Sequence, residues 1–375
     1  MPSTPLRQNV LKNAKRIVVK LGTQLLAQPD AHEPGIDIRF ISQITEQIAR
    51  LKSEGYEITI VSSGAIGAGC VDLGLMKRPV DIADLQAVAA IGQRCLMRHM
   101  HEAFSRFGLH VGQMLLTRED FDDRNRFLNI RNCICRLQEL GCIPVINEND
   151  TVAIDEIRFG DNDLLAALTC NALRADALLL LTVVDGLLDD QGGVIDMIDN
   201  VDQYLSMVKT NKSQWSRGGM QSKLEAARLV TDAGEIAVIC SGREENVLPR
   251  ILGGQKLGTV FVPGNRKLDS RQRWIGLTAR PAGTITIDDG AANAVTTGGK
   301  SLLASGIYQI IGRFERGDIV LIQNLHGKEL ARGLSNYSAD ELFLIKGKRS
   351  DQFEQILGRT AYAEVIHRNN MVVLK

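Results

Sequence analysis

The feature that most constrains the fold is a regular alternation of short apolar runs with segments of helical periodicity, which continues to about residue 262. Between the runs, apolar residues recur three or four positions apart, as at Ile41, Ile44, Ile48 and Leu51. Strands that alternate with helices predict an α/β fold, with a mainly parallel sheet between layers of helices. The apolar runs have the length of buried strands and cover residues 17–21, 58–61, 109–116, 142–146, 177–182, 236–240 and 259–262.

The pattern changes after Arg266. A basic connector with Trp274 begins there, and short strands with turn signals follow, for example at 283–287 and 317–322. This change predicts a small β-rich domain after the α/β domain. We place the α/β domain at 10–265, a linker at 266–279 and the β-rich domain at 280–375.

Charge and cysteine usage limit the classes of function. Lys plus Arg and Asp plus Glu both number 44, so net charge gives no reason to expect electrostatic attraction to nucleic acid or to a membrane. No apolar run is long enough to span a membrane, and seven scattered cysteines are typical of reduced thiols. We therefore expect a cytoplasmic protein.

A loop rich in Asn, Asp and Glu follows the run that ends at Ile146. In a parallel sheet, polar groups at the carboxyl ends of strands converge on a ligand site. Crowded carboxylates are unfavourable unless a metal ion or lysine side chains lie among them, although a solvated acidic hairpin fits the composition equally well. Six carboxylates fall within sixteen residues: Glu148, Asp150, Asp155, Glu156, Asp161 and Asp163.

Two lysines stand beside small residues at the ends of predicted elements. Lys20 interrupts an apolar run just before Gly22, so it either snorkels to solvent or faces an anionic ligand. Lys223 lies one turn into a predicted helix that begins after two glycines, where free N–H groups and the helix dipole favour an anion, unless this is an ordinary capped surface helix. The small-residue turn at 62–69 either approaches an anion through its amides or lets a helix pack tightly against a strand.

These parts suit phosphoryl transfer. Cations neutralise the charge on the moving phosphoryl group, and carboxylates hold Mg²⁺ or orient the lysines. A carboxylate acceptor is already ionised at neutral pH and needs no general base. No P-loop, zinc-ligand spacing or nucleophile elbow competes with this interpretation.

Several motifs, in order along nearly the whole chain, resemble those of the glutamate 5-kinases of the amino-acid kinase family. Residues from about 280 onward resemble a PUA domain, a small β-barrel. The resemblance implies a kinase-type α/β sandwich at 10–265 and a PUA-like domain at 280–375. The kinase motifs occupy residues 18–23, 62–69, 111–117, 144–150, 160–163 and 218–223.

The resemblance also implies an activity and partners. The activity is ATP-dependent phosphorylation of the γ-carboxylate of L-glutamate with Mg²⁺, which gives L-glutamyl 5-phosphate in the first step of proline biosynthesis. Proline as a feedback inhibitor at the glutamate site, a homo-oligomer (dimer or tetramer) and RNA binding by the PUA-like domain are further implications.

Carried over by position, the resemblance assigns roles to individual residues. The catalytic set is Lys20, Lys223 and Asp163, and glutamate would be held by Ser63, Asp150 and Asn162. No metal ligand is assigned. The nucleotide site would be lined by Lys20, Gly22, Thr182, Val183, Arg217, Gly218, Gly219, Met220, Gln221, Ser222 and Lys223.

Two departures from the family pattern affect the nucleotide rim. Val183 stands where an Asp is usual, and Ser216-Arg217 replaces Gly-Thr. The rim is therefore more positive by about two charges, and we expect altered nucleotide affinity or base preference. Arg217 could add a contact to the ATP phosphates.

Two other functions compete with this one. The first is a kinase for another small acid such as N-acetylglutamate or aspartate, which the Asn-Glu-Asn-Asp loop and the added β-rich domain disfavour. The second is an RNA-binding or regulatory protein with an inert kinase half, which the intact Lys20, Lys223, Asp150 and Asp163 disfavour.

Overall fold

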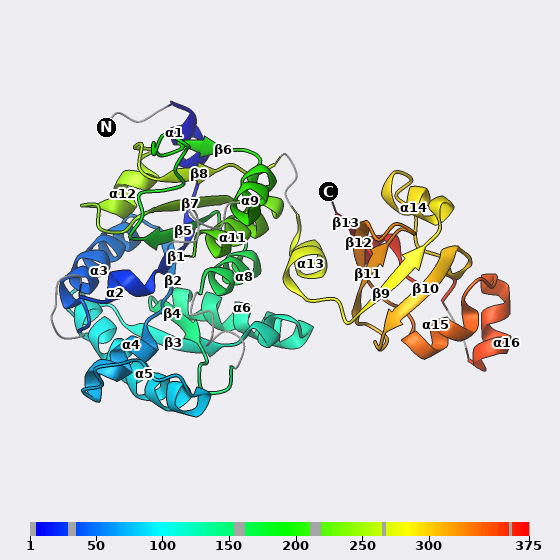
Figure 1. Cartoon of the computed structure of the whole chain (residues 1–375), viewed down its shortest axis with the longest axis horizontal. Coiled ribbons are helices and arrows are strands. Elements are labelled where there is room, and N and C mark those ends of the chain that lie inside the picture. Colours follow the sequence, from blue (N-terminus) through cyan, green and yellow to red (C-terminus); the bar gives the residue numbers. More distant parts are fainter. Residues whose placement is uncertain are drawn as a thin grey trace. The chain divides into compact units, whose positions relative to one another are not determined.

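The computed structural model of the chain describes residues 5–28, 35–153, 162–210, 219–264, 268–359 and 362–374 (Figure 1). Its residues divide into two compact units. The first contains residues 1–121 and 125–267, and the second contains 122–124 and 268–375. Within the part of the chain that the structure describes, no helix has the length and apolar character needed to cross a membrane.

The first unit is built on an eight-stranded sheet of order β3-β4-β2-β1-β5-β7-β8-β6. All neighbours from β3 to β7 are parallel, whereas β8 runs antiparallel to β7. The predicted mainly parallel sheet is therefore confirmed. The strands are β1 (Arg16–Leu21), β2 (Glu57–Val61), β3 (Val111–Leu116), β4 (Ile143–Glu148), β5 (Ala177–Thr182), β6 (Met197–Ile198), β7 (Ile236–Ser241) and β8 (Thr259–Phe261).

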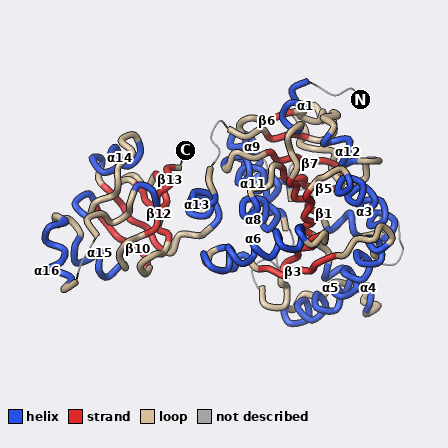
Figure 2. The backbone as a smooth tube through the Cα atoms, turned by 180° about the vertical axis from the view of Figure 1, so that it is seen from behind, coloured by secondary structure: helices blue, strands red, loops and turns tan. Residues whose placement is uncertain are grey.

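Helices cover both faces of this sheet, as the two opposite views show (Figures 1 and 2). The α3, α5 and α12 helices pack on one face, and α8, α9 and α11 form a group on the other. The described helices of this unit are α1 (Pro5–Leu11), α2 (Thr23–Leu26), α3 (Ile38–Ser53), α4 (Ala65–Asp72), α5 (Ile82–Ser105), α6 (Arg124–Glu139), α8 (Asp163–Leu173), α9 (Val201–Thr210), α11 (Met220–Asp232) and α12 (Val247–Leu252), with a 3-10 turn, η1 (Arg118–Phe121).

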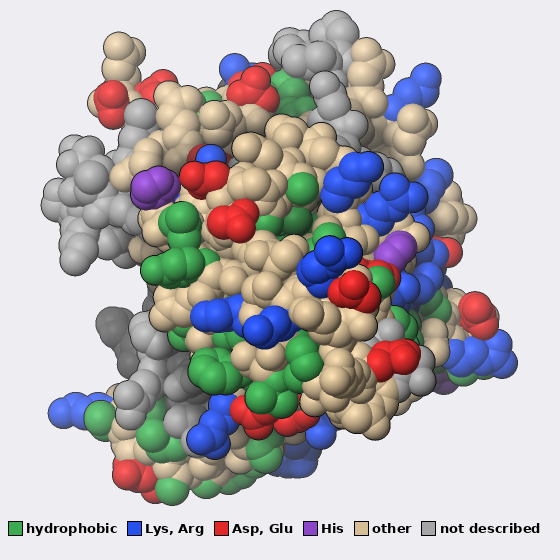
Figure 3. Space-filling model, turned by 90° about the vertical axis from the view of Figure 1, so that its right-hand side faces the viewer, with side chains coloured by type: hydrophobic (Ala, Val, Ile, Leu, Met, Phe, Trp, Pro, Cys, Tyr) green, Lys and Arg blue, Asp and Glu red, His purple; other side chains and the backbone are tan. Residues whose placement is uncertain are grey.

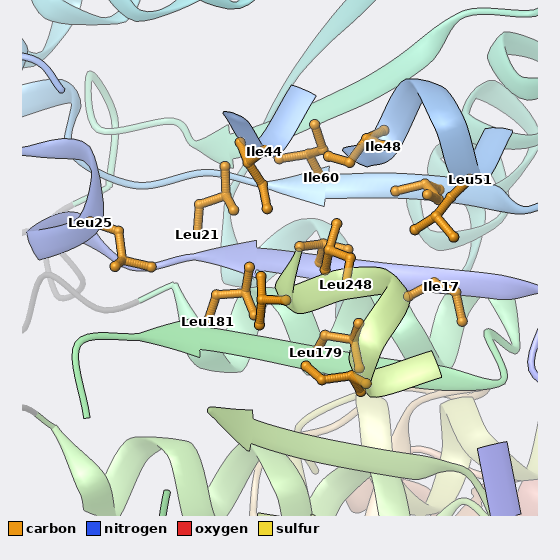
Figure 4. Packing of buried hydrophobic residues seen from close by; sticks show 14 of the residues in the cluster. Ile17, Leu21, Leu25, Ile44, Ile48, Leu51, Ile60, Leu179, Leu181 and Leu248 are labelled. Carbon is orange, nitrogen blue, oxygen red and sulfur yellow. The ribbon is translucent and has the colours of Figure 1, made fainter. Parts of the chain in front are cut away.

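Strand alternation decides which way Lys20 points. Ile17, Val19 and Leu21 of β1 belong to the core beneath α3 and α12, where Figure 4 shows Ile17 and Leu21 among the aliphatic side chains of neighbouring elements. Because successive side chains of a strand point to opposite faces, Val18 and Lys20 face the other layer, which contains α8 and α11. The strand therefore delivers one charged side chain to that layer.

The small-residue segment at 62–69 is more than the expected turn, because residues from Ala65 onward form α4. Gly64 caps this helix in the left-handed conformation, with φ of 87°. A Cβ on Gly69 would lie 2.0 Å from the carbonyl oxygen of Val88, and one on Gly92 would lie 1.8 Å from that of Ala65. The glycines thus let α4 and α5 pack backbone to backbone, so the close contact is between two helices rather than between a helix and a strand.

The second unit contains a five-stranded sheet of order β10-β9-β11-β12-β13, which confirms the β-rich C-terminal region. Part of the expected linker is helical: α13 (Ser270–Arg273) runs into a π-helical turn, η2 (Trp274–Thr278), that buries Trp274. The remaining elements are β9 (Gly283–Ile287), α14 (Asp289–Thr296), η3 (Ala304–Gly306), β10 (Ile307–Gly312), β11 (Ile319–Gln323), β12 (Glu329–Leu334), α15 (Ala339–Ile345), η4 (Ser350–Gln352), α16 (Phe353–Leu357), η5 (Arg368–Asn370) and β13 (Met371–Val373).

The distribution of charged side chains agrees with the equal numbers of basic and acidic residues in the sequence. On the face shown in Figure 3, Lys and Arg side chains are interspersed with Asp and Glu side chains. All seven cysteines are free thiols.

Candidate active site

The centre of the site is one carboxylate shared by two lysines. Asp163, the first residue of α8, lies with Oδ1 2.7 Å from Lys20 Nζ and Oδ2 3.0 Å from Lys223 Nζ. The three side chains come from β1, α8 and α11 and are at most 4% exposed. Lys20 therefore does not snorkel; its charge is met inside the protein.

Two ammonium groups thus share one carboxylate in this buried group. Attraction to Asp163 offsets part of the cost of burying the two ammonium groups. Ser222, one residue before Lys223, donates a hydrogen bond of 2.9 Å to Asp163 Oδ2 and helps to fix the carboxylate. Fixed cations of this kind can stabilise charge on a phosphoryl group.

The residues expected to hold glutamate meet at one cavity of about 320 Å³. Ser63, Asp150 and Asn162 all line it, and Asn162 directly precedes Asp163 in the chain. The hydroxyl of Ser63 is buried and makes no hydrogen bond within the described residues, so it is available to a ligand. The cavity is lined by Thr23, Ser63, Gly64, Ala65, Ile66, Gly67, Cys70, Leu75, Met76, Arg78, Asn147, Glu148, Asp150 and Asn162.

A buried amide relay, which sequence reasoning missed, holds Asn162 in place. Its Nδ2 donates to the carbonyl oxygen of Ser62 (2.6 Å) and to Asn147 Oδ1 (2.7 Å). Asn147 in turn donates to Gln93 Oε1 of α5 (2.6 Å). The polar Asn147 at the end of an apolar strand was the available signal, whereas nothing local marked Gln93.

The acidic loop is more than a solvated hairpin where the structure describes it. Glu148 and Asp150 line the cavity, and Asp163 is paired with Lys20 and Lys223. Among the described residues, no group of three or more His, Cys, Asp or Glu could hold a metal ion. Asp155, Glu156 and Asp161 lie outside the described residues.

The end of β1 and the end of β5 meet where the nucleotide is expected. The amide of Gly22 donates to the carbonyl oxygen of Leu181 (3.1 Å), and a Cβ on Gly22 would lie 3.0 Å from that oxygen. Thr182, the last residue of β5, is buried, whereas Val183 is 41% exposed. Glycine at position 22 therefore keeps the two strand ends close beside Lys20.

The described part of the glycine-rich helix start is not an ordinary capped surface helix, because Lys223 is buried. Gly219 is the N-cap of α11, with φ of 68°, and no side chain caps the first turn. Met220 is buried, and Gln221 faces outward and donates to Glu225 Oε1 (2.9 Å). Ser222 and Lys223 are therefore the residues of this turn that contact Asp163. Arg217 and Gly218 lie outside the described residues.

Comparison with known proteins defines the class. The model of the Amino acid kinase family matches residues 15–241, and the PUA domain model matches residues 283–357. The chain therefore belongs to the amino acid kinase family and carries a C-terminal PUA domain.

Relatives that align with nearly the whole chain show to which group within the family it belongs. The chain is 43% identical to Glutamate 5-kinase of Citrifermentans bemidjiense, over 98% of this chain and 100% of the relative. It is 44% identical to Glutamate 5-kinase of Methylococcus capsulatus, over 98% and 99%. Within its family, the chain groups with the glutamate 5-kinases.

A solved structure supports the fold alone. Carbamate kinase of Giardia matches with a TM-score of 0.50 and 18% identity, over 67% of this chain and 100% of that one.

Proposed function

We propose that the protein transfers the γ-phosphoryl group of ATP to the γ-carboxylate of L-glutamate, which gives L-glutamyl 5-phosphate, the first intermediate on the route to proline. The observation that carries this function is the buried Lys20–Asp163–Lys223 group, next to a cavity lined by Ser63, Asp150 and Asn162. The full-length relatives named Glutamate 5-kinase favour glutamate over N-acetylglutamate or aspartate.

Each part of the group has a task in this reaction. The acceptor carboxylate is ionised at neutral pH, so no base is required. Lys20 and Lys223 stabilise the charge spread over the transferring phosphoryl group, and Asp163 fixes both ammonium groups in position. The amide relay through Asn147 orients Asn162, which contacts the substrate.

The nucleotide would bind across the ends of β1 and β5 and the first turn of α11. Gly22, Thr182, Val183 and the segment 217–223 would line it. Mg²⁺ would be held mainly by the nucleotide phosphates, which requires no protein cluster of three acidic ligands, and it would neutralise phosphate charge.

Three further proposals rest on the family resemblance. Proline would compete for the glutamate cavity, because it carries the same α-carboxylate beside a positively charged nitrogen. The protein would form a homo-oligomer, and the PUA domain would bind RNA. Size measurement in solution and binding of labelled single-stranded RNA at several salt concentrations test the last two.

The decisive experiment traps the acyl phosphate as its hydroxamate in the presence of ATP, Mg²⁺ and L-glutamate. Glutamate-dependent hydroxamate that disappears in Lys223→Ala supports both the reaction and the lysine. Parallel reactions with aspartate and N-acetylglutamate test the substrate. Turnover with one of those acids alone would replace the substrate, and no turnover with any acid would favour the inert, RNA-binding alternative.

A further inference from the structure

The loop between α4 and α5 contributes a cation to the substrate cavity. Arg78 is the only Lys or Arg among the described residues that line it. Burial raises the pKa of the Cys70 thiol in the same wall, and the positive charge of Arg78 opposes that rise, so its charge acts on the cavity wall. Lys20 and Lys223 do not line this cavity, because both converge on Asp163.

Glutamate presents three charges that the site must match. Its γ-carboxylate must reach the lysines and the nucleotide, which leaves the α-ammonium and the α-carboxylate in the cavity. Glu148 and Asp150 are anions that complement the ammonium. The α-carboxylate then needs a cation or N–H donors, and acidic residues cannot supply either.

Two features of the cavity can supply them. Ala65, Ile66 and Gly67, in the first turn of α4, line the cavity. The N-cap of this helix is Gly64, so no N-cap side chain occupies the amides of that turn. Amides at a helix N-terminus favour an anion. Arg78 adds a full charge and a planar pair of donors that fits a carboxylate.

We propose that Arg78 recognises the α-carboxylate of glutamate, together with the first turn of α4, and selects substrates in which that group is ionised. This inference rests on the proposed function and assigns the non-reacting end of its substrate. Arg78 is exposed, so solvent reduces the gain, and we expect it to contribute about 10- to 100-fold in substrate preference.

The test compares L-glutamate with L-isoglutamine, which keeps the γ-carboxylate but carries an α-carboxamide. In the unaltered protein, kcat/KM favours glutamate. In Arg78→Gln, kcat/KM for glutamate falls about 10- to 100-fold, mainly through KM, while that for isoglutamine changes less than about 3-fold. If isoglutamine is phosphorylated too slowly to measure, its binding is measured instead from its inhibition of glutamate phosphorylation. The KM for ATP stays constant.

Two further variants separate recognition from loop structure. Lys77→Gln removes the adjacent cation, which does not line the cavity, and leaves the preference unchanged. Arg78→Lys keeps the charge and restores part of the preference. Equal losses for both substrates in Arg78→Gln would overturn the assignment, although glutamate would still be phosphorylated. Failure of the unaltered protein to phosphorylate glutamate would instead refute the proposed function.

Discussion

Removal of the shared carboxylate should uncouple ATP binding from turnover. Asp163→Asn keeps the shape of the side chain but abolishes the charge between Lys20 and Lys223. At 2.7 and 3.0 Å, the two pairs attract with about 6 kcal/mol each at an effective dielectric constant of 20, most of which offsets the cost of burying the charges. The variant removes the carboxylate that the two buried ammonium groups share.

Breaking a buried ion pair in this way typically costs about 3–5 kcal/mol, and we expect the free energy of unfolding to fall by that amount. We expect kcat to fall by about 10²- to 10³-fold because the lysines are no longer held at the phosphoryl group. The KM for ATP should not rise, since the site becomes more positive. Few mutations would lower kcat and stability while preserving ATP affinity.

Urea denaturation and the hydroxamate assay measure these quantities on the same preparation. Ser222→Ala is the matched control, because it removes a hydrogen bond to the same carboxylate and keeps both ion pairs; it should cost about 1.5 kcal/mol and leave turnover within a few-fold. If Asp163→Asn unfolds at the urea concentration of the unaltered protein and keeps more than half of its turnover, the shared carboxylate has neither of these roles.

The remaining predictions concern the relay, the nucleotide rim and a buried thiol. Asn147→Ala removes the acceptor for Asn162 and should raise the KM for glutamate about 10-fold in steady-state kinetics; an unchanged KM would exclude the relay from substrate positioning. Arg217→Thr should raise the KM for ATP by about 5-fold at low salt and less at high salt, and an unchanged KM would end the idea of a phosphate contact. Burial raises the pKa of Cys240 from 9.0 to about 12, so its contribution to stability is complete below pH 9 and is lost as pH rises to 12. Between pH 7 and pH 10.5, the free energy of unfolding should fall by about 2 kcal/mol more in the unaltered protein than in Cys240→Ala. Equal decreases in the two proteins would contradict the raised pKa of Cys240.

The parts of the fold that followed from the sequence are those in which local pattern and burial agree. The apolar runs became strands because a parallel strand covered on both faces is apolar throughout, and Lys20 was conspicuous because it broke such a run. The α4 helix was missed because glycines at 67 and 69 weaken helical propensity. Gly69 is needed for contact with α5, whereas a Cβ on Gly67 would meet open space, and no local pattern reveals that contact.

The site could be predicted only in part, for a related reason. The clustered carboxylates indicated that cations lie nearby, but the sequence left a metal ion and lysines as alternatives. The lysine pairs became visible only in the tertiary structure, since Lys20, Asp163 and Lys223 come from three separate elements. Gln93 lies on a helix far from Asn147 in sequence, so its role depends on how α5 packs.

The shared carboxylate also has a consequence for the synthesis of the chain on the ribosome. Lys20 is made early, Asp163 well past the middle of the kinase unit, and Lys223 close to its end. Until Lys223 leaves the exit tunnel, Asp163 can pair only with Lys20 of these two lysines. The complete Lys20–Asp163–Lys223 group therefore forms late in synthesis, when most strands of the parallel sheet have already been made.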